Sequence, residues 1–258
     1  MKKKTPKPAT GAAQALARGL KVLDVVAESP VPLTSTEIAR RVGLHQSWVS
    51  RILTTLTVAG YVRKPSYHSF ASDYGVLTLG TNAQHHFPLV TRPREALAEL
   101  ANQLPDGSHL TLGTLWHGQL VYLIRATRGA PVAAAFSGFP LHLSTIALRL
   151  LLELPTSQAM AHLEASRQRY GWERPTKSVA KSPRGVLDYA RKHVKLGCLI
   201  AKGYYQPDQL NVTVPVDCAG EPRAALAIHG PSAGLTVDRA IAHLLRGQRA
   251  VETALRAE

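Results

Sequence analysis

The sequence predicts a two-domain fold, in which a small helical domain with a short β-hairpin precedes a larger α+β domain. Between about residues 15 and 79, apolar positions recur at the spacing of short amphipathic helices. From Pro93 onward, helical stretches alternate with stretches that have the two-residue period of strands. Of the 258 residues, 45% are hydrophobic and 19% are charged, so the chain can bury more than one core.

The chain is strongly basic, because 31 Lys and Arg residues against 17 Asp and Glu residues give a formal net charge of +14. This excess favours an anionic partner such as nucleic acid or an acidic lipid surface. Cys198 and Cys218 form neither a disulfide framework nor a CxxC metal pair. No apolar run approaches the roughly 18 residues of a membrane span, and charges interrupt the basic start before a signal-peptide core. We therefore expect a cytoplasmic protein with no part in a membrane.

Signals for two short helices joined by a glycine turn lie at residues 33–56. Thr34 and Glu37 have the spacing of a capping box, and Leu33 and Ile38 that of the accompanying hydrophobic staple. Gly43 is placed to end this helix, and a second helix is expected to begin near residue 45 or 46. Such a pair, preceded by a helix at 16–27, predicts a helix-turn-helix unit.

The second helix of this pair has one apolar face and one polar face. The apolar face carries residues 49, 52, 53 and 56, whereas the polar face carries Gln46, Ser47, Trp48, Ser50 and Arg51. In a helix-turn-helix unit such a face lies in the major groove of DNA. Residues 61–71 then predict a β-hairpin, or wing, with a turn at 65–66 and basic residues at its tip.

The remaining elements are assigned from periodicity. A helix is expected from about Asp73 to residue 86. In the larger domain we expect four strands, at 109–116, 119–126, 211–216 and 223–229. We also expect four helices in this domain, at 94–104, 143–154, 183–195 and 237–257. The expected organisation is a flexible basic tail at 1–12, a winged helix-turn-helix domain at 13–72, a linker helix at 73–92, and an α+β domain at 93–258.

The chain resembles the IclR family of bacterial transcriptional regulators over almost its whole length. The runs that carry the resemblance are ARGLKVL at 17–23, LTSTEIA at 33–39, GLHQSWVSRIL at 43–53, LTVAGYV at 56–62, LTLG at 77–80, FPLH at 139–142, VPV at 214–216 and AIHGP at 227–231. Three features depart from the family pattern. Trp48 replaces a small residue, most often Thr; Ala147-Leu148 replaces Gly-Lys; and the segment 197–216 is diverged, with Asn211 at the position of a Cys.

The resemblance implies an all-α winged helix-turn-helix with a short β-wing, which binds double-stranded DNA at a palindromic operator as a homodimer or tetramer. The candidate DNA-binding residues are Thr36, Arg40, Gln46, Ser47, Trp48, Ser50, Arg51, Arg63 and Lys64. Arg51 can contact guanine or phosphate, and Gln46 can contact adenine or stay solvated. Trp48 can face DNA, or fold back as part of the core.

For the larger domain, the resemblance implies a GAF-like antiparallel sheet that binds a small organic effector, a carboxylic or aromatic acid. The candidate effector-binding residues are Tyr122, His142, Asn211, Thr213 and His229. A lone strand histidine is more often a satisfied core residue, which is the alternative for His142 and His229. The apolar surroundings of Val214 and Ala227 favour a less polar pocket than that of relatives that bind very small acids.

A sequence-specific DNA-binding regulator is therefore the expected function, without a cofactor, metal site or catalytic residue. A nonspecific basic nucleic-acid-binding protein is the alternative, because it accounts for the charge but not for the larger domain. A small-molecule enzyme is the third class. The chain has no GxSxG, HExxH or GxxxxGK[ST] motif, which argues against it.

Overall fold

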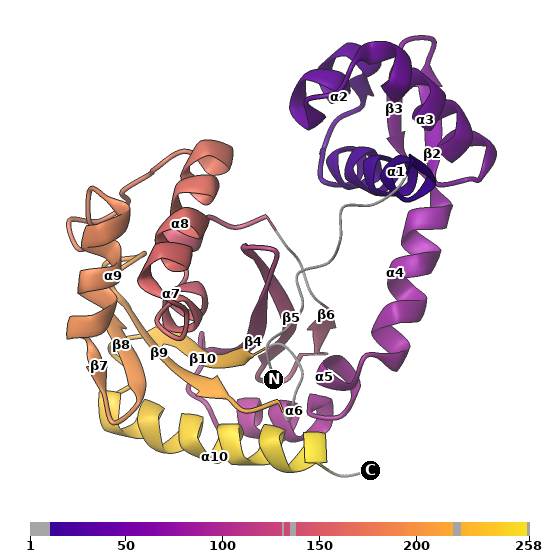
Figure 1. Ribbon diagram of the computed structural model, residues 1–258. Coiled ribbons are helices and arrows are strands. Elements are labelled where there is room, and N and C mark those ends of the chain that lie inside the picture. Colours follow the sequence, from indigo (N-terminus) through magenta and orange to yellow (C-terminus); the bar gives the residue numbers. More distant parts are fainter. Residues whose placement is uncertain (1–10, 131, 135–137, 219–222, 257–258) are drawn as a thin grey trace. The chain divides into compact units, whose positions relative to one another are not determined.

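The chain folds into two compact units, Met1–Ala83 and Gln84–Glu258 (Figure 1). The structure is a computed structural model, in which residues 11–130, 132–134, 138–218 and 223–256 are described. Most of the expected basic tail, residues 1–10, lies outside the described residues. The helix expected from Asp73 is α4, Tyr74–His86, and the division between the two units falls inside it.

The first unit consists of helices packed against a small sheet. Its elements are α1 (Gly11–Ala27), β1 (Leu33–Thr34), α2 (Ser35–Val42), α3 (Gln46–Val58), β2 (Val62–Ser66), β3 (Ser69–Ser72) and the start of α4. The strands form an antiparallel sheet in the order β1-β3-β2. Its core is built from α1, α2, α3 and the first strand residues, and includes Val22, Val26, Leu33, Ile38, Val42, Val49, Leu53 and Val62.

Local signals fix the ends of α2. The Thr34 side chain accepts a hydrogen bond from the Glu37 backbone N–H, while the Glu37 carboxylate accepts one from Thr34 N at 2.7 Å, so the capping box is confirmed. Gly43 ends the helix in the left-handed region, with φ of 69°. A glycine adopts this conformation without steric strain, which allows α3 to begin only three residues later.

The hairpin is present, but its turn was assigned to the wrong residues. Strands β2 and β3 are joined at Tyr67 and His68, not at residues 65–66. Arg63 and Lys64 therefore lie along β2 rather than at the tip. Pro65 lies within β2 in extended conformation. This is possible because β2 is at the edge of its sheet, where a proline breaks no ladder hydrogen bond.

The second unit is a seven-stranded antiparallel sheet with helices on both faces. The strands are β4 (His109–Trp116), β5 (Gln119–Thr127), β6 (Ala133–Ala134), β7 (Val194–Lys195), β8 (Cys198–Lys202), β9 (Gln209–Val216) and β10 (Ala224–Pro231), in the order β6-β5-β4-β10-β9-β8-β7. The four strands expected from the sequence are thus β4, β5, β9 and β10.

Helices cover each face of this sheet (Figure 1). They are α5 (Pro88–Thr91), α6 (Arg94–Asn102), the 3-10 turn η1 (Leu141–Leu143), α7 (Thr145–Leu151), α8 (Thr156–Tyr170), α9 (Pro183–Lys192) and α10 (Val237–Arg256). One core lies between the sheet and α6 and α10, and a second lies between the sheet and α7, α8 and α9. Helix α8 was not expected from the sequence. Its mixed polar and apolar pattern explains why the periodicity did not reveal it.

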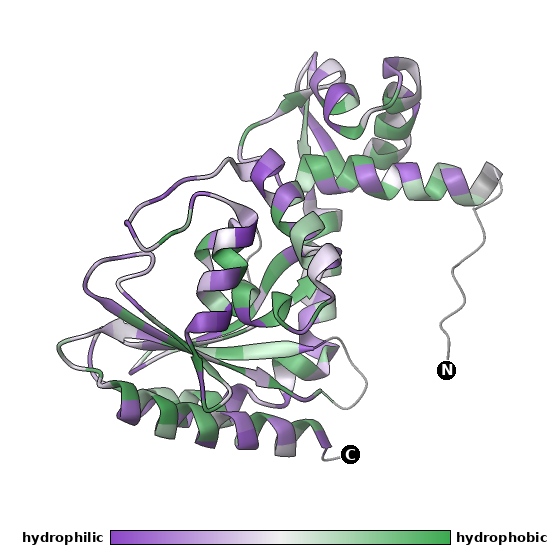
Figure 2. Cartoon of the chain, turned by 60° about the vertical axis from the view of Figure 1, so that its left-hand side comes forward, coloured by the Kyte–Doolittle hydropathy of each residue, from purple (hydrophilic) through white to green (hydrophobic). Residues whose placement is uncertain are grey.

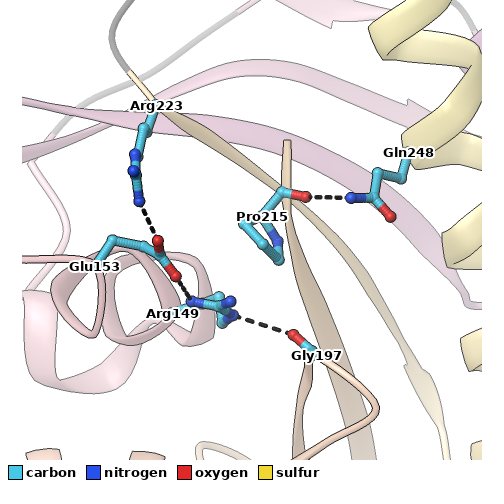
Figure 3. Close-up of polar contacts among 6 residues, drawn as sticks. All are labelled: Arg149, Glu153, Gly197, Pro215, Arg223 and Gln248. Carbon is cyan, nitrogen blue, oxygen red and sulfur yellow. Dashed lines mark hydrogen bonds and ion pairs between the residues drawn. The ribbon is translucent and has the colours of Figure 1, made fainter. Parts of the chain in front are cut away.

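The central strand β10 serves both cores by alternation. Leu226 and Ile228 pack into the core with α10, whereas Ala225 and Ala227 pack into the core with α7. Figure 2 shows that the strands of the large sheet are mainly apolar, whereas α10 alternates apolar and polar segments. Gln248 on α10 also donates to the Pro215 carbonyl on β9 at 2.9 Å (Figure 3).

Helix α7 is buried along its whole length and carries one charged side chain, Arg149. Arg149 Nε donates to the Gly197 carbonyl at 3.2 Å, and its guanidinium pairs with Glu153. Glu153 also pairs with Arg223, the residue before β10 (Figure 3). A buried guanidinium is tolerated only when it is paired and hydrogen-bonded. Arg149 links α7 to Gly197, and Glu153 links Arg149 to Arg223, so the two residues together connect this helix to two distant segments of the chain.

This network leads to a stability prediction. Glu153→Ala is expected to lower the free energy of unfolding of the second unit by about 1.5–3 kcal/mol, because it leaves buried Arg149 without its carboxylate. The matched control is Glu164→Ala, which removes an exposed ion pair to Arg167 and is expected to change stability by about 0–1 kcal/mol. Calorimetric melting of the full chain measures both, and equal losses in the two variants would contradict the role of Glu153.

Candidate functional site

The polar face of α3 is the first candidate site. Gln46, Ser47, Trp48, Ser50 and Arg51 are all exposed, as the sequence predicts. The opposite face is anchored, because the side chains of residues 49 and 53 are fully buried in the core of the first unit. The exposed face therefore combines amide, hydroxyl and guanidinium groups on a helix that is fixed from beneath, which suits contact with base edges.

Contacts within the unit orient the first turn of α3. The His45 side chain caps the helix, since its Nδ1 accepts from Ser47 N at 3.3 Å. Gln46 Nε2 donates to Ser35 Oγ on α2 at 3.2 Å. These contacts leave further donor and acceptor capacity on the exposed Gln46 amide.

Trp48 lies at the surface rather than in the core. Its residue is 48% exposed, and the Arg18 guanidinium of α1 lies 5.3 Å from the centre of its ring. Arg18 was not among the residues selected from the sequence. A cation over an aromatic face at this distance is a stabilising contact. Only the tertiary structure brings these two residues together, since they lie 30 positions apart in the sequence.

The other expected DNA-binding residues lie on α2 and β2. Thr36 and Arg40 are exposed on α2. Arg63 Nε donates to the Ser72 carbonyl at 3.2 Å, and the Lys64 ammonium lies 5.4 Å from the ring centres of both Tyr67 and Phe70. Both cations remain exposed at the surface of the hairpin.

A partly open pocket of about 220 Å³ in the second unit is the second candidate site. It lies on the sheet face that carries α7, near the η1 turn and the segment that joins β8 to β9. The described residues that line it are His109, Thr111, Tyr122, Arg125, Phe139, Leu143, Ser144, Thr145, Tyr205, Gln206, Gln209, Asn211 and His229. Its wall is more polar than the sequence indicated, because only Phe139 and Leu143 lack a polar side-chain atom.

Strand register creates a polar row across the pocket. His229 on β10 lies opposite His109 on β4 and opposite Asn211 on β9. The two imidazoles stack with their centres 4.9 Å apart, and His229 Nδ1 contacts Asn211 Oδ1. The sequence predicts Asn211 and His229 as ligand contacts but not His109, because strand register decides which residues become neighbours.

Electrostatics leave this pocket with a single permanent cation. Burial, with His109 and Arg125 nearby, lowers the pKa of His229 to about 3. Burial and Arg125 lower the pKa of His109 to about 4. Among the described lining residues, Arg125 alone carries a permanent charge, and no carboxylate faces it. The pocket is therefore suited to one negative charge on a ligand.

The aromatic side of the pocket is formed by three rings. Tyr122 and Phe139 have ring centres 6.2 Å apart, and Phe139 and Tyr205 have centres 5.7 Å apart, both in edge-to-face arrangements. The Tyr122 hydroxyl donates to Ser144 Oγ at 3.2 Å, and burial raises the pKa of Tyr122 to about 12. This hydroxyl is therefore un-ionised at neutral pH.

Two expected effector residues do not line this pocket. His142 is fully buried; its Nε2 contacts the Glu173 carbonyl at 2.8 Å and its ring stacks on Trp172. Thr213 is also fully buried and donates to Thr145 Oγ1 at 2.8 Å. Thr213 is thereby satisfied within the protein, whereas His142 Nδ1 is buried without a hydrogen-bond partner among the described residues.

The sequence reasoning also missed most of the pocket wall, including the charged residue. Arg125 lies on a predicted strand in which no motif singles it out, and the FPLH run at 139–142 indicated only His142 as a ligand contact. Arg125 on β5 and Asn211 on β9 are separated by β4 and β10, so the sheet order is needed to see that they line the same pocket. Within the described residues, no group of three or more His, Cys, Asp or Glu could hold a metal ion. None of the described helices is both long and apolar enough for a bilayer crossing.

Comparisons with known proteins agree with this geometry. The family model described as the IclR helix-turn-helix domain matches residues 15–66. The chain is 27% identical to the acetate operon repressor of Salmonella typhimurium, over 91% of this chain and 86% of that protein. It is also 27% identical to the transcriptional repressor IclR of Escherichia coli K12, over 90% and 85% of the two chains.

Solved structures share the fold of the whole chain. An IclR-family transcriptional regulator from Brucella abortus aligns with a TM-score of 0.75 at 24% identity, covering 93% of this chain and 92% of that one. An IclR homologue from Microbacterium hydrocarbonoxydans, solved in complex with 4-hydroxybenzoate, aligns with a TM-score of 0.63 at 22% identity, covering 95% and 100%. Residues 15–66 thus match the IclR helix-turn-helix domain, a DNA-binding domain, and the chain as a whole is similar to transcriptional regulators of the IclR family.

Proposed function

We propose that this regulator recognises one operator sequence through the exposed face of α3 and that a small aromatic acid binds the pocket of its second unit. The observation that carries the first part is the anchored helix α3, whose first turns present base-reading groups to solvent. Gln46 and Arg51 are the side chains best suited to pair with adenine and guanine edges. Ser47 and Ser50 add hydroxyl groups to the same surface.

Basic side chains around α3 supply the contacts to the DNA backbone. Arg40, Arg63 and Lys64 are exposed and are suited to phosphate, and Thr36 adds a hydroxyl donor on α2. Such contacts position the protein and give binding its salt dependence, but they carry no sequence information. We assign the choice of operator to α3 for this reason.

A second copy of the chain completes the proposed operator complex. One helix-turn-helix reads only a few base pairs, so symmetric dimers on palindromic half-sites are the usual solution. Helix α4 has no buried residue among those described, and its apolar side chains at Leu77 and Leu79 are 65% and 59% exposed. This unpartnered apolar surface supports a homodimer, or a tetramer built from two dimers.

The proposed effector follows from the pocket chemistry. Arg125 is suited to a carboxylate, the rings of Tyr122, Phe139 and Tyr205 to an aromatic body, and the hydroxyl groups of Ser144 and Thr145 to a polar substituent. The complex of the Microbacterium hydrocarbonoxydans homologue with 4-hydroxybenzoate supports the same ligand class. The volume of about 220 Å³ favours a single small ring over a larger ligand.

The operator proposal is tested with a double variant of α3. Selection from random DNA with the full-length chain is expected to enrich one palindromic duplex. Gln46→Ala/Arg51→Ala should bind this duplex at least tenfold more weakly at fixed salt, because each lost base contact is worth about 1–3 kcal/mol. Fluorescence anisotropy measures the affinity.

The matched control is Gln168→Ala/Arg239→Ala, which removes the same two side-chain types from exposed positions of the second unit. It is expected to bind the duplex like the wild-type chain. A folded Gln46/Arg51 variant with undiminished affinity would refute the assignment of base reading to α3. Enrichment of no sequence would instead favour a nonspecific nucleic-acid-binding protein.

The effector proposal is tested by removing the charge of the pocket. The wild-type chain is expected to bind 4-hydroxybenzoate at least tenfold more tightly than uncharged 4-hydroxybenzamide, because an ionic hydrogen bond contributes about 1.5–3 kcal/mol. Arg125→Gln should lose this preference. Arg128→Gln is the control, since Arg128 pairs with exposed Asp106 and lies outside the pocket. Isothermal titration measures the dissociation constants. Tighter binding of glyoxylate than of aromatic acids would contradict an aromatic acid as the effector.

The lowered histidine pKa values predict how acid binding depends on pH. His229 and His109 have pKa values of about 3 and 4, so both stay neutral from pH 6 to 8 and the charge of the empty pocket is constant. The affinity for a benzoate should therefore change less than about twofold over this range. A tenfold increase for each unit that the pH falls would show that a histidine takes up a proton on binding, contrary to the prediction.

A further inference from the structure

Trp48 and Arg18 form a pair on the DNA-facing side of the first unit. We propose that this pair determines part of the operator sequence: the indole edge packs against the C5-methyl group of a thymine, while the Arg18 guanidinium, held over the indole face, neutralises a phosphate of the same half-site. This inference rests on the proposed binding of DNA by α3. It adds a base-reading residue and a backbone contact that the helix-turn-helix motif does not itself require.

The position of Trp48 assigns it to the reading surface. It is the third residue of α3, and the first turn of a recognition helix is the part that reaches base edges. Its neighbour Val49 is fully buried, so the helix is held and Trp48 points away from that contact. Ser50 and Arg51 lie beside it on the exposed side. In the part of the chain that the structure describes, no group accepts a hydrogen bond from the indole N–H.

The chemistry of a half-exposed indole selects its partner. At 48% exposure, Trp48 leaves apolar ring surface in water, and covering this surface is favourable. The C5-methyl group of thymine is the apolar group that base edges present in the major groove. Arg18 already covers one face of the ring, which leaves the ring edge for this contact. The stacked cation also restricts the indole, so less side-chain freedom is lost on binding.

Arg18 has the properties of a phosphate ligand. Its guanidinium forms no ion pair with any described residue, and it lies 5.3 Å from the centre of the Trp48 ring. A cation placed beside the first turn of α3 will lie close to the sugar–phosphate wall of the groove that α3 enters. The guanidinium keeps its hydrogen-bond donors at its edge while its plane contacts the ring, so stacking and phosphate binding are compatible.

The thymine contact is tested with the duplex enriched by the full-length wild-type chain. Each thymine is replaced in turn by deoxyuridine, which removes only the methyl group. The wild-type chain is expected to bind about fourfold more weakly at one thymine position of each half-site, which is the value of one buried methyl group. Trp48→Ala should bind the parent duplex more weakly and show no further loss at that position.

Two further variants make this result specific. Trp48→Phe keeps an aromatic edge without the N–H, and it is expected to retain sensitivity to the methyl group. Val58→Ala removes an exposed apolar side chain from the other end of the same helix and should behave like the wild-type chain. Circular dichroism melting confirms that each variant is folded before its affinity is compared.

The Arg18 contact is tested by the salt dependence of binding. Arg18→Gln is expected to reduce the slope of log affinity against log salt concentration by about 0.9 per subunit, the value for one phosphate contact. Trp48→Ala should reduce this slope as well, because the cation loses the ring that holds it. An unchanged slope in Arg18→Gln would overturn the phosphate contact.

The outcomes separate this inference from the proposal on which it depends. Enrichment of no duplex contradicts operator recognition itself. An enriched duplex, bound less tightly by Gln46→Ala/Arg51→Ala, supports operator recognition. If the wild-type chain and a folded Trp48→Ala variant then lose the same affinity at every deoxyuridine position, Trp48 reads no methyl group and only this inference falls.

Discussion

The burial of one side of α3 is the constraint on which the DNA-binding surface depends. Val49 and Leu53 are fully buried, and each apolar side chain of this size contributes about 1.5–3 kcal/mol when removed from water. This burial fixes the rotation of the helix about its own axis. The residues on the opposite side of the helix are thereby held at the surface; they are Gln46, Ser47, Trp48, Ser50 and Arg51. A recognition helix without this anchor would present no fixed set of side chains to DNA.

The second unit solves a different problem, because it must keep polar groups inside a protein layer. Its sheet has helices on both faces, so the polar residues of β4, β9 and β10 face α7 rather than water. His109, Asn211 and His229 form a row there through strand register. Burial keeps the two imidazoles neutral, and Arg125 remains as the charge that a ligand can meet.

Two arginines of this unit differ in burial and in role: Arg149 is buried, whereas Arg125 is exposed at the pocket. Arg149 is satisfied by Glu153 and the Gly197 carbonyl, so it contributes to the packing of α7 and has little left to offer a ligand. Arg125 lines a cavity with no carboxylate among the described lining residues. The sequence presents both simply as arginines within apolar segments, and the difference lies in whether an anion from a distant segment reaches them.

The sequence by itself determined the local structure of the first unit. The signals that predicted α2 and α3 each involve residues a few positions apart: the capping box at Thr34, the turn at Gly43 and the apolar spacing of α3. Because these signals are local, the sequence alone was enough to predict where α2 ends and α3 begins. The strand pattern of the larger domain was equally local, and β4 was placed residue by residue. The turn of the hairpin was misplaced because Pro65 was interpreted as a turn residue, whereas an edge strand tolerates it.

The tertiary structure alone decided which residues became neighbours over long distances. Arg18 meets Trp48 only through the packing of α1 on α3, and His109 meets His229 only through the pairing of β4 with β10. His142 and Thr213 were expected in the pocket, yet His142 Nε2 contacts the Glu173 carbonyl and the Thr213 hydroxyl donates to Thr145. Periodicity indicates which side of an element is apolar, but it contains no information about which element covers that side. The chemistry of both sites therefore depends on packing between segments that are far apart in the chain.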